Sequence, residues 1–379
     1  MRITNAEIYN SYRKCFIRAD LTVEDGKFAE ILYTGSGDGE IDKRIVPGFI
    51  DIHSHGAMGI DMFTSGCDKL IEMSGFYAKN GITTLFPTTM SEKHDKIMRM
   101  IEEVKKAKPK AKINFEGIHV EGPYINRKKA GAHSLDLIKD KPNMSELEDI
   151  MSAVLDCGLK LHITLAPELD GAYEFMAAAI KKGATISLGH TEADGETVRK
   201  ATSLGARSFT HLFNAMPQIH HRNAGTVTYA LIGDTYVEVI CDGIHLSPEI
   251  VKLVYKAKSS EKIILVSDSM AASGLPEGSY NLGTSRGVIV ENGKAFIRRP
   301  DGTETIAGST TNLYKELNNF MSFTGQSLEN SLLAVTKNPA ECVGIYDRKG
   351  SVETGKDADF VVLDMNGGIK EVYVNGEKR

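Results

Sequence analysis

Short apolar stretches and longer amphipathic stretches alternate from Val46 onward, and the alternation repeats eight times. Each apolar stretch has the length of a buried strand, and most intervals carry apolar residues at helical spacing. Glycines such as Gly81, Gly158 and Gly183 follow the inferred helices, where a left-handed cap favours glycine. The predicted strands are Phe49–His53, Thr83–Pro87, Ile113–Glu121, Leu159–Ala166, Ala184–Gly189, Ala206–His211, Tyr236–Asp242 and Lys262–Asp268. The predicted helices include Glu92–Lys108, Glu146–Cys157, Glu168–Lys182, Ala193–Ser203 and Pro248–Lys258.

Eight consecutive strand–helix units predict a closed parallel (β/α)8 barrel of the TIM type, with an open doubly wound sheet as the alternative. No G-x-G-x-x-G turn follows the first strand, which weakens a dinucleotide-binding version of the open sheet. Residues 275–305 are rich in glycine and short strands, so we expect a β-hairpin insertion after the eighth strand. The barrel with its insertion is expected to span residues 47–345.

Both ends of the chain carry short strands without intervening helices. Residues 1–46 predict three strands, and residues 346–379 predict two more before an Asn-Gly turn. Neither end has enough apolar residues for a core of its own. We therefore expect one small β-sandwich domain built from both termini, with two independent flaps as the alternative.

Composition narrows the class of protein. Apolar residues make up 41% and charged residues 25% of the 379 residues, as is usual for a soluble globular protein, and the net charge is −5. No basic patch dominates, so we expect no nucleic-acid partner. The five cysteines are far apart and form no C-x-x-C pair, which favours a reducing compartment and argues against a thiolate zinc site. Because neither a signal peptide nor a membrane-spanning run is recognisable, we expect a cytoplasmic location and no membrane partner.

The first predicted strand ends in the motif I-V-P-G-F-I-D-I-H-S-H-G, which contains His53 and His55. Residues two apart on an extended strand point to the same side, so both imidazoles leave the backbone together. A divalent metal would satisfy two such rings, because histidine is its commonest side-chain ligand. A strand end with solvated rings is the alternative explanation for this pair alone.

Later strand ends supply more residues of the same chemical kind. In a barrel of this type the active site lies at the carboxyl ends of the strands. A rim on which nearly every available position is His, Glu or Asp is hard to explain structurally. Nitrogen and oxygen donors without thiols suit one or two first-row divalent ions in a catalytic site. The residues at these ends are His53 and His55, Glu121, His190, His211, Asp242 with His245, and Asp268.

Three of these residues, Glu121, His190 and His211, form a sufficient metal site with room for water. Burial of the Glu121 carboxylate requires a metal or, alternatively, a nearby arginine. Asp268 follows the most apolar strand, and a carboxylate beside metal-bound water can take its proton and return it to a leaving group. A plain helix N-cap is the alternative role for Asp268. Three further histidines are expected only to pack: His94, His119 and His162.

Taken together, these motifs resemble the amidohydrolase superfamily and, within it, the N-acetylglucosamine-6-phosphate deacetylases. The segments that carry the resemblance are H-V-E-G-P, G-A-H, L-G-H-T, T-H-L-F-N-A-M, D-G-I-H and V-S-D-S-M. Their order and spacing match over essentially the whole chain, including the split β domain and A-G-S-T. The resemblance implies metal-dependent hydrolysis of N-acetyl-D-glucosamine 6-phosphate to D-glucosamine 6-phosphate and acetate, in amino-sugar catabolism or recycling.

The resemblance also implies which residues hold the metal. The primary site falls on Glu121, His190 and His211. His53 and His55 are both present, so a second ion is expected to be possible, with Glu121 as the bridging ligand. One or two divalent ions per subunit are therefore expected, and zinc, iron, manganese and cobalt suit these donors alike.

The remaining implied roles concern catalysis and the substrate. Asp268 is expected to act as acid and base, and His133, with Ala132 beside it, to polarise the acetyl carbonyl. Asn214 and Ala215 would hold the phosphate, one through its side chain and one through a backbone N–H. The residues expected to line the sugar are Asp242, His245, Ala307, Gly308, Ser309 and Thr310.

Arg222, in H-H-R-N-A-G, would pair with the same phosphate, a charge-assisted contact that suits guanidinium geometry. In this family the corresponding arginine reaches in from the neighbouring subunit, which implies a homodimer. His220 and His221 receive no role, because a solvated loop explains them as well. The alternatives for the whole chain are an N-acetylgalactosamine-6-phosphate deacetylase, a dihydroorotase-like cyclic amidase and a non-catalytic scaffold.

Overall fold

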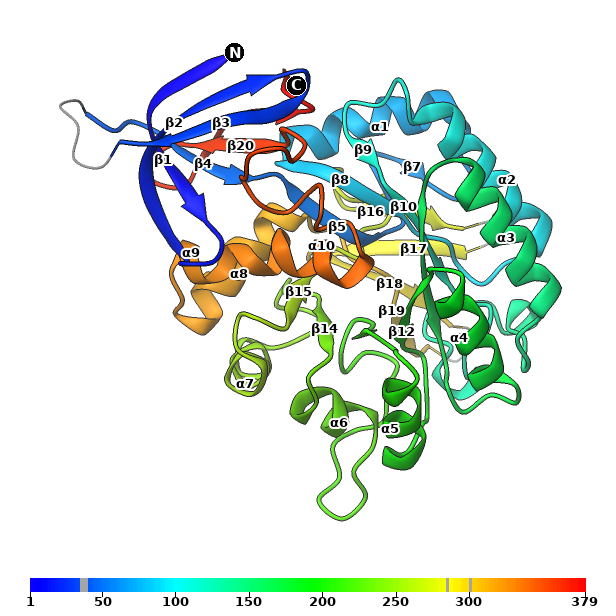
Figure 1. The fold of residues 1–379 in the computed structure, drawn as a ribbon. Helices are drawn as coiled ribbons and strands as arrows, with labels where there is room; N and C mark the ends of the chain where they lie inside the picture. Colours follow the sequence, from blue (N-terminus) through cyan, green and yellow to red (C-terminus); the bar gives the residue numbers. More distant parts are fainter. Residues whose placement is uncertain (35–39, 284–285, 300–301) are drawn as a thin grey trace.

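A computed structural model describes residues 1–34, 40–283, 286–299 and 302–379 of the chain. A body of parallel strands and surrounding helices is joined to a separate sheet to which both ends of the chain belong (Figure 1). The prediction of an insertion at residues 275–305 includes residues 284–285 and 300–301, which lie outside the described residues.

The strands of the body pair in parallel and form two sheets, with the orders β5-β8-β9 and β10-β11-β12-β13-β14-β15. Isolated parallel bridges connect these sheets at two places, Ser54 with Ser269 and Thr88 with His119. The structure therefore shows an α/β fold with parallel strands, as predicted. The bounds are β5 (Phe49–Ser54), β8 (Ile82–Pro87), β9 (Asn114–Phe115), β10 (Gly117–Glu121), β11 (Lys160–Leu165), β12 (Thr185–Leu188), β13 (Ser208–Phe209), β14 (Tyr236–Val239) and β15 (Ile263–Leu265).

One predicted strand is divided. The sequence predicts a single strand from Ile113 to Glu121, but the chain breaks at Glu116 between β9 and β10. The Glu116 carboxylate accepts a hydrogen bond from the Arg348 guanidinium at 2.6 Å. β9 pairs with β8 and β10 pairs with β11, so the break lies where the chain passes from one sheet to the other.

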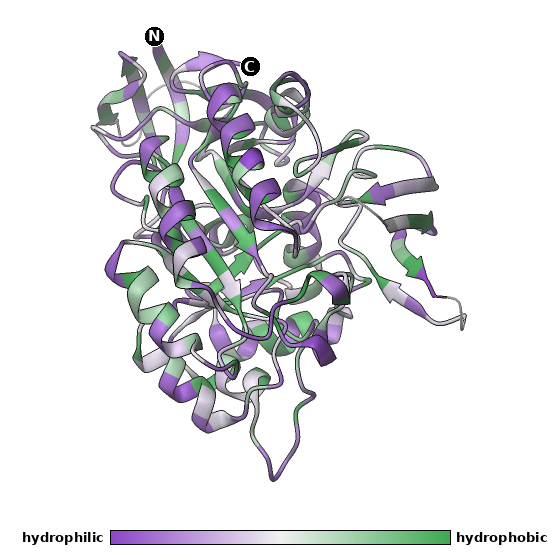
Figure 2. Cartoon of the chain, turned by 90° about the vertical axis from the view of Figure 1, so that its right-hand side faces the viewer, coloured by the Kyte–Doolittle hydropathy of each residue, from purple (hydrophilic) through white to green (hydrophobic). Residues whose placement is uncertain are grey.

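Helices cover the outside of the parallel strands, and their ends follow from local sequence. The Asn143 side chain caps α3 by accepting from the N–H of Ser145, and Pro248 occupies the first turn of α7, where its missing N–H costs nothing. In Figure 2 the central strands are mainly hydrophobic, whereas hydrophilic residues gather on the helices. The bounds are α1 (Cys67–Lys79), α2 (His94–Ala107), α3 (Met144–Asp156), α4 (Ala172–Lys181), α5 (Gly195–Ser203), α6 (Thr226–Ile232), α7 (Pro248–Lys258), α8 (Leu313–Thr324), α9 (Leu328–Ser331) and α10 (Lys337–Val343), with the 3-10 turns η1 (Arg127–Lys129), η2 (Leu135–Leu137) and η3 (Leu332–Val335).

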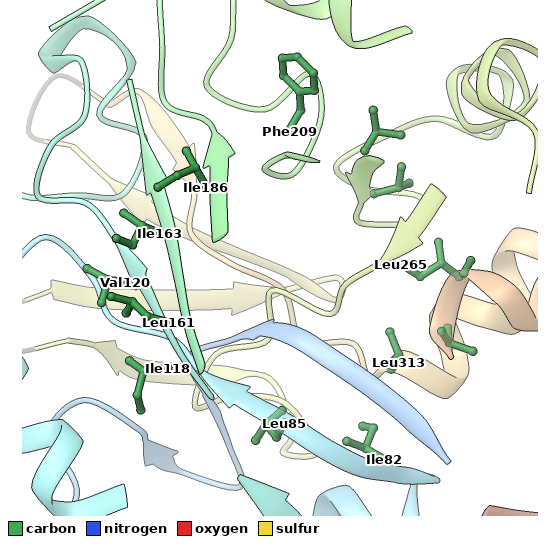
Figure 3. Close-up of a cluster of buried hydrophobic side chains, with 14 of the residues drawn as sticks. Ile82, Leu85, Ile118, Val120, Leu161, Ile163, Ile186, Phe209, Leu265 and Leu313 are labelled. Carbon is green, nitrogen blue, oxygen red and sulfur yellow. The ribbon is translucent and has the colours of Figure 1, made fainter. Parts of the chain in front are cut away.

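Alternation along the strands separates the apolar core from a polar interior. On β10, Ile118 and Val120 join the large apolar cluster under the helices (Figure 3). The residues that alternate with them, His119 and Glu121, are buried but do not belong to that cluster. Because successive side chains of a strand point to opposite faces, these polar groups face the inside of the parallel strands. The same alternation on β11 places Leu161 on the apolar side.

Strands from both termini form one continuous sheet with the order β22-β21-β20-β4-β1-β2-β3. Strand β4 pairs in parallel with β1 on one edge and antiparallel with β20 on the other, and so joins the two ends of the chain. The predicted joining of both termini in one β domain is seen, and the rings of Phe28 on β3 and Phe360 on β20 lie 5.9 Å apart. The bounds are β1 (Arg2–Asn10), β2 (Cys15–Glu24), β3 (Lys27–Tyr33), β4 (Arg44–Pro47), β20 (Phe360–Leu363), β21 (Ile369–Val374) and β22 (Glu377–Lys378).

The insertion after β15 is larger than the predicted hairpin. It is a four-stranded antiparallel sheet in sequential order, β16 (Gly278–Leu282), β17 (Arg286–Glu291), β18 (Lys294–Arg298) and β19 (Glu304–Ile306). A two-stranded ribbon, β6 (Gly56–Ala57) and β7 (Ile60–Asp61), follows β5. Among the described residues, no helix has the length and apolar character needed to span a membrane.

Candidate metal centre and active site

Five imidazoles converge on the carboxylate of Glu121, which ends β10 and is 3% exposed. The closest are His190 and His211, whose Nε2 atoms each lie 3.1 Å from Glu121 Oε1 and 3.1 Å from each other. The remaining Nε2 distances to the carboxylate are 3.4 Å from His55, 3.4 Å from His133 and 3.6 Å from His53. Strand ends far apart in the sequence thus place the predicted ligands around one point.

Hydrogen bonds at the second ring nitrogen show which imidazoles can offer a lone pair. Nδ1 of His190 lies 2.6 Å from the carbonyl oxygen of Lys129, and a carbonyl only accepts. His190 therefore carries its proton on Nδ1 and offers Nε2 as a ligand. Nδ1 of His53 lies 3.2 Å from the Glu238 carboxylate, which fixes the same tautomer.

His133 has the opposite tautomer. Its Nδ1 accepts a hydrogen bond from the backbone N–H of Ser91 at 3.0 Å, so the proton of the neutral ring is on Nε2. Burial lowers the pKa of His133 to about 4, with Glu121 opposing the shift, and the ring is neutral at pH 7. His133 thus presents an N–H donor to the site, whereas His190 presents a lone pair.

The residues form two groups suited to a divalent cation, His53 with His55 and Glu121, and Glu121 with His190 and His211. Within the described residues, the buried Nε2 of His53 has no hydrogen-bond partner. Burial disfavours the charged His53 ring, but Glu121 and Asp268 outweigh burial and raise its pKa well above the ordinary value. The same negative groups would stabilise a metal cation in place of that proton. The donor set therefore fits a divalent ion.

Asp268 lies directly beside this cluster. Its Oδ1 is 3.2 Å from Nε2 of His55 and 3.5 Å from Nε2 of His53. Burial opposes ionisation, but His53 and His55 hold the pKa of Asp268 below its ordinary value, so the group is a carboxylate at neutral pH. No helix of the described chain begins at Asp268, so the alternative role as a helix N-cap is wrong.

The backbone turns sharply where the strands deliver these side chains. His190, His211 and Asp268 have φ values of 48°, 30° and 43°, in the left-handed region that non-glycine residues seldom adopt. Each such residue costs of order 1–3 kcal/mol and persists only when its surroundings require it. Ala215 has a φ of 53°, so four of the predicted site residues occupy such strained positions.

A cavity of about 410 Å³ opens above the cluster, within the usual size range of small-ligand sites. Predicted residues that line it are His55, Glu121, Ala132, His133, His190, His211, Asn214, Ala215, His245, Asp268 and Gly308. Asp242 stands behind His245, with its carboxylate 2.7 Å from the ring Nδ1. Residues that line the cavity but were missed are Met90, Lys128, Lys129, Gly131, Leu282, Glu304, Thr305 and Ile306.

Among the described residues, six predicted ones do not line this cavity, namely His53, Asp242, Ala307, Ser309, Thr310 and Arg222. Ala307 is buried, and Ser309 supports the backbone, since its N–H donates to the carbonyl of Asp268 at 2.7 Å. Thr310 donates its hydroxyl to the carbonyl of Gly293. Arg222 is exposed on the loop before α6, next to the stacked rings of His220 and His221.

Two buried carboxylates near His53 were also missed. Glu238 is on β14 and contacts the His53 ring, while Asp51 accepts from the hydroxyl of Ser267 at 2.6 Å. Burial raises the pKa of Asp51 to about 6, with Ser267 opposing the shift. Asp51 shares a strand face with His53 and His55, so the spacing D-x-H-x-H contained a usable signal. Glu238 is a single acid in an apolar strand and gave none.

Comparison with known proteins agrees with this geometry. A family model described as the amidohydrolase family matches residues 44–379. The chain belongs to the amidohydrolase family. The resemblance predicted from the sequence motifs is confirmed, because 31–35% identical relatives from bacteria and animals carry the name N-acetylglucosamine-6-phosphate deacetylase.

Individual amidohydrolase relatives match nearly end to end. The N-acetylglucosamine-6-phosphate deacetylase of Bacillus subtilis is 35% identical over 358 residues, covering 91% of this chain and 88% of its own. The crystal structure of the deacetylase from Thermotoga maritima has a TM-score of 0.90 at 32% identity, covering 100% of this chain and 99% of that one. The Mycobacterium smegmatis deacetylase, solved as an aspartate-to-alanine mutant in complex with N-acetyl-D-glucosamine-6-phosphate, has a TM-score of 0.87 at 30% identity, covering 100% and 98%.

Proposed function

We propose that this protein hydrolyses the acetamide of N-acetyl-D-glucosamine 6-phosphate and releases D-glucosamine 6-phosphate and acetate. Family membership and the names of the full-length relatives support this activity. The observation that carries the proposal is the meeting of Nε2 of His190, Nε2 of His211 and Oε1 of Glu121, each 3.1 Å from the others, at a cavity of sugar size.

The proposed primary ligands are Glu121, His190 and His211. When bound there, a divalent metal supplies Lewis-acid chemistry, which acidifies water and polarises an amide carbonyl. His53 and His55 would hold a second ion together with Glu121. Oε1 of Glu121 lies 3.6 Å from Nε2 of His53, and Oε2 of Glu121 lies 3.4 Å from Nε2 of His55. Zinc, iron, manganese and cobalt all suit these nitrogen and oxygen donors.

Asp268 is proposed to move the proton. As a buried carboxylate beside His53 and His55, it accepts a proton from the attacking water and later donates it to the departing amine nitrogen. His133 is proposed to donate its Nε2–H to the acetyl carbonyl oxygen as negative charge develops there. The tautomer fixed by the Ser91 N–H supports this role.

The substrate roles follow the lining of the cavity. Asn214 and Ala215 are proposed to hold the phosphate, and His245, with Asp242 behind it, to contact the sugar with Gly308. Arg222 is exposed and does not line the cavity of its own chain. We therefore propose that Arg222 contacts the phosphate in the site of a second copy, in a homodimer.

The finer description of the fold belongs to the same proposal. We infer that the parallel strands close into an eight-stranded barrel, with the small sheet as a domain of residues 1–46 and 346–379. The bridges Ser54 to Ser269 and Thr88 to His119 support closure, because the first connects β5 with the residues after β15 and the second connects the end of β8 with β10. In a closed barrel the candidate site lies at the carboxyl ends of the strands, the usual place for catalysis.

Acetate release by the purified chain tests the proposed activity. N-acetylglucosamine 6-phosphate and N-acetylgalactosamine 6-phosphate are assayed by acetate release and dihydroorotate by ring opening, at equal concentration, each with and without a chelator. The proposal expects chelator-sensitive acetate release with the highest kcat/KM on the first compound. Turnover of dihydroorotate alone would support the cyclic-amidase alternative, and turnover of none would contradict the proposal.

A further inference from the structure

A layer of polar side chains fills the interior of the parallel strands beneath the candidate metal ligands. Its hydroxyls form a chain in which Thr164 contacts Thr210 at 2.7 Å and Thr210 donates to Ser187 at 2.6 Å. The rings of His119 and His162 lie in the same layer, with ring centroids 4.8 Å apart. The members of the layer, His119, His162, Thr164, Ser187, Thr210 and Glu238, are each 0% exposed.

Glu238 is the acidic member of this layer and binds two histidines at once. Its Oε2 accepts from Nδ1 of His53 at 3.2 Å, and its Oε1 lies 3.4 Å from Nε2 of His162. Ser187 donates its hydroxyl to the same Oε1 at 3.5 Å. The carboxylate therefore has partners for both oxygens.

The hydrogen bond between Glu238 and His53 determines which ring nitrogen of His53 is free to bind a metal ion. A carboxylate only accepts, so the proton of the neutral His53 ring lies on Nδ1 and its lone pair on Nε2. That Nε2 points toward Glu121 and Asp268 and has no hydrogen-bond partner within the described part of the chain. A carboxylate behind a ligating imidazole also increases the basicity of the ring.

We propose that Glu238 is a positioning residue that fixes the tautomer and orientation of His53 for binding a divalent metal ion. The inference rests on the proposed metal centre, which it deepens by identifying what holds one ligand in place. The buried Nδ1 atoms of His55 and His211 have no hydrogen-bond partner among the described residues. His53 thus differs from His55 and His211, because a carboxylate holds its Nδ1. Metal binding by the group of His53, His55 and Glu121 should therefore depend most on Glu238.

Zinc retention by the full-length chain tests the role. The Zn²⁺-loaded protein is equilibrated against rising concentrations of a chelator, and the zinc kept per chain is counted. Glu238→Gln retains one acceptor oxygen but removes the charge, and Glu238→Met removes both. Loss of such a supporting group typically weakens metal binding by about 10–100-fold, so Glu238→Gln should release zinc at a correspondingly lower chelator concentration. Glu238→Met should release it earlier still.

Glu316→Gln is the matched control, because Glu316 is also 0% exposed but, among the described residues, contacts the backbone N–H of Cys241 and no histidine. It should retain zinc like the wild type. The melting temperature of each variant is measured with and without zinc, since a purely structural role would lower both values equally. Unchanged zinc retention in Glu238→Gln would overturn the inference, even if Glu238→Met does not fold. A wild-type chain that retains no zinc would instead contradict the metal centre itself.

Discussion

Replacement of Asp268 by Asn separates proton transfer from folding and metal binding. The change keeps the size of the side chain and does not affect the backbone bonds at this position, in which the Asp268 N–H donates to the carbonyl of His53 at 2.9 Å. It also leaves the ligand group of Glu121, His190 and His211 intact. The variant loses a carboxylate that can accept a proton 3.2 Å from the ring of His55.

The size of the effect follows from that single loss. General acid–base catalysis by one positioned group contributes about 10²–10⁴-fold, or roughly 2.7–5.4 kcal/mol of barrier. The carboxylate is buried, so bulk water cannot readily replace it, and we expect Asp268→Asn to lie at the upper end of this range. KM should change little, because Asp268 is proposed to act on the water and the leaving amine.

Three measurements on one preparation decide the result. Acetate release from N-acetylglucosamine 6-phosphate gives kcat, elemental analysis gives metal per chain, and thermal unfolding reports the fold. The expected outcome is a loss of at least about 10²-fold in kcat with metal content and melting temperature nearly unchanged. A variant that retains metal and turns over within threefold of the wild type would remove Asp268 from its proposed role.

Glu121→Ala should lose metal outright, whereas the His53→Ala/His55→Ala double variant should keep one ion on Glu121, His190 and His211; metal counts in the opposite order would reverse the assignment. Arg222→Ala should lower kcat/KM about 10–150-fold for the phosphorylated sugar and hardly for N-acetylglucosamine, since a charge-assisted hydrogen bond is worth roughly 1.5–3 kcal/mol. Equal losses on both sugars would remove Arg222 from phosphate binding, and isolated heterodimers of Arg222→Ala with Asp268→Asn should recover one intact site if Arg222 acts across the interface. Burial and, after it, repulsion by Asp242 raise the pKa of Glu316 well above its ordinary value. The stability that protonated Glu316 contributes is therefore fully present below its pKa in the unfolded chain, and it is lost as the pH rises through its pKa in the folded chain. Glu316→Gln should therefore unfold at a higher temperature than the wild type at pH 8 but not at pH 4, and identical melting curves at pH 8 would contradict the protonated state.

Strand ends were the most predictable part of the site. His53, Glu121, His190 and His211 come directly at or after short apolar runs, and parallel strands bring their carboxyl ends to one face. The sequence therefore indicated which residues would meet, although not their distances or tautomers. The tautomer of His133 depends on the Ser91 N–H, 42 positions away in the chain, and no local pattern reports such a contact.

Other features depend on contacts that no periodicity records. In the sequence, Glu238 is an ordinary polar residue in an apolar strand, and only the folded structure brings it into contact with His53. Lys128 faces the cavity from the turn between Glu121 and His133, although a run of basic residues there is typical of a solvated loop. The split between β9 and β10 lies at Glu116, whose carboxylate pairs with Arg348, 232 positions away.

The dependence of deacetylation on the metal of the Glu121, His190 and His211 group tests the central claim most directly. Acetate release from N-acetylglucosamine 6-phosphate is measured on one sample as metal is withdrawn by a chelator and then restored, with metal per chain counted at each step. We predict that activity falls and recovers in proportion to bound metal in the wild type, and that Glu121→Ala neither binds metal nor recovers. Undiminished acetate release from metal-free protein, or full recovery by Glu121→Ala, would contradict the account.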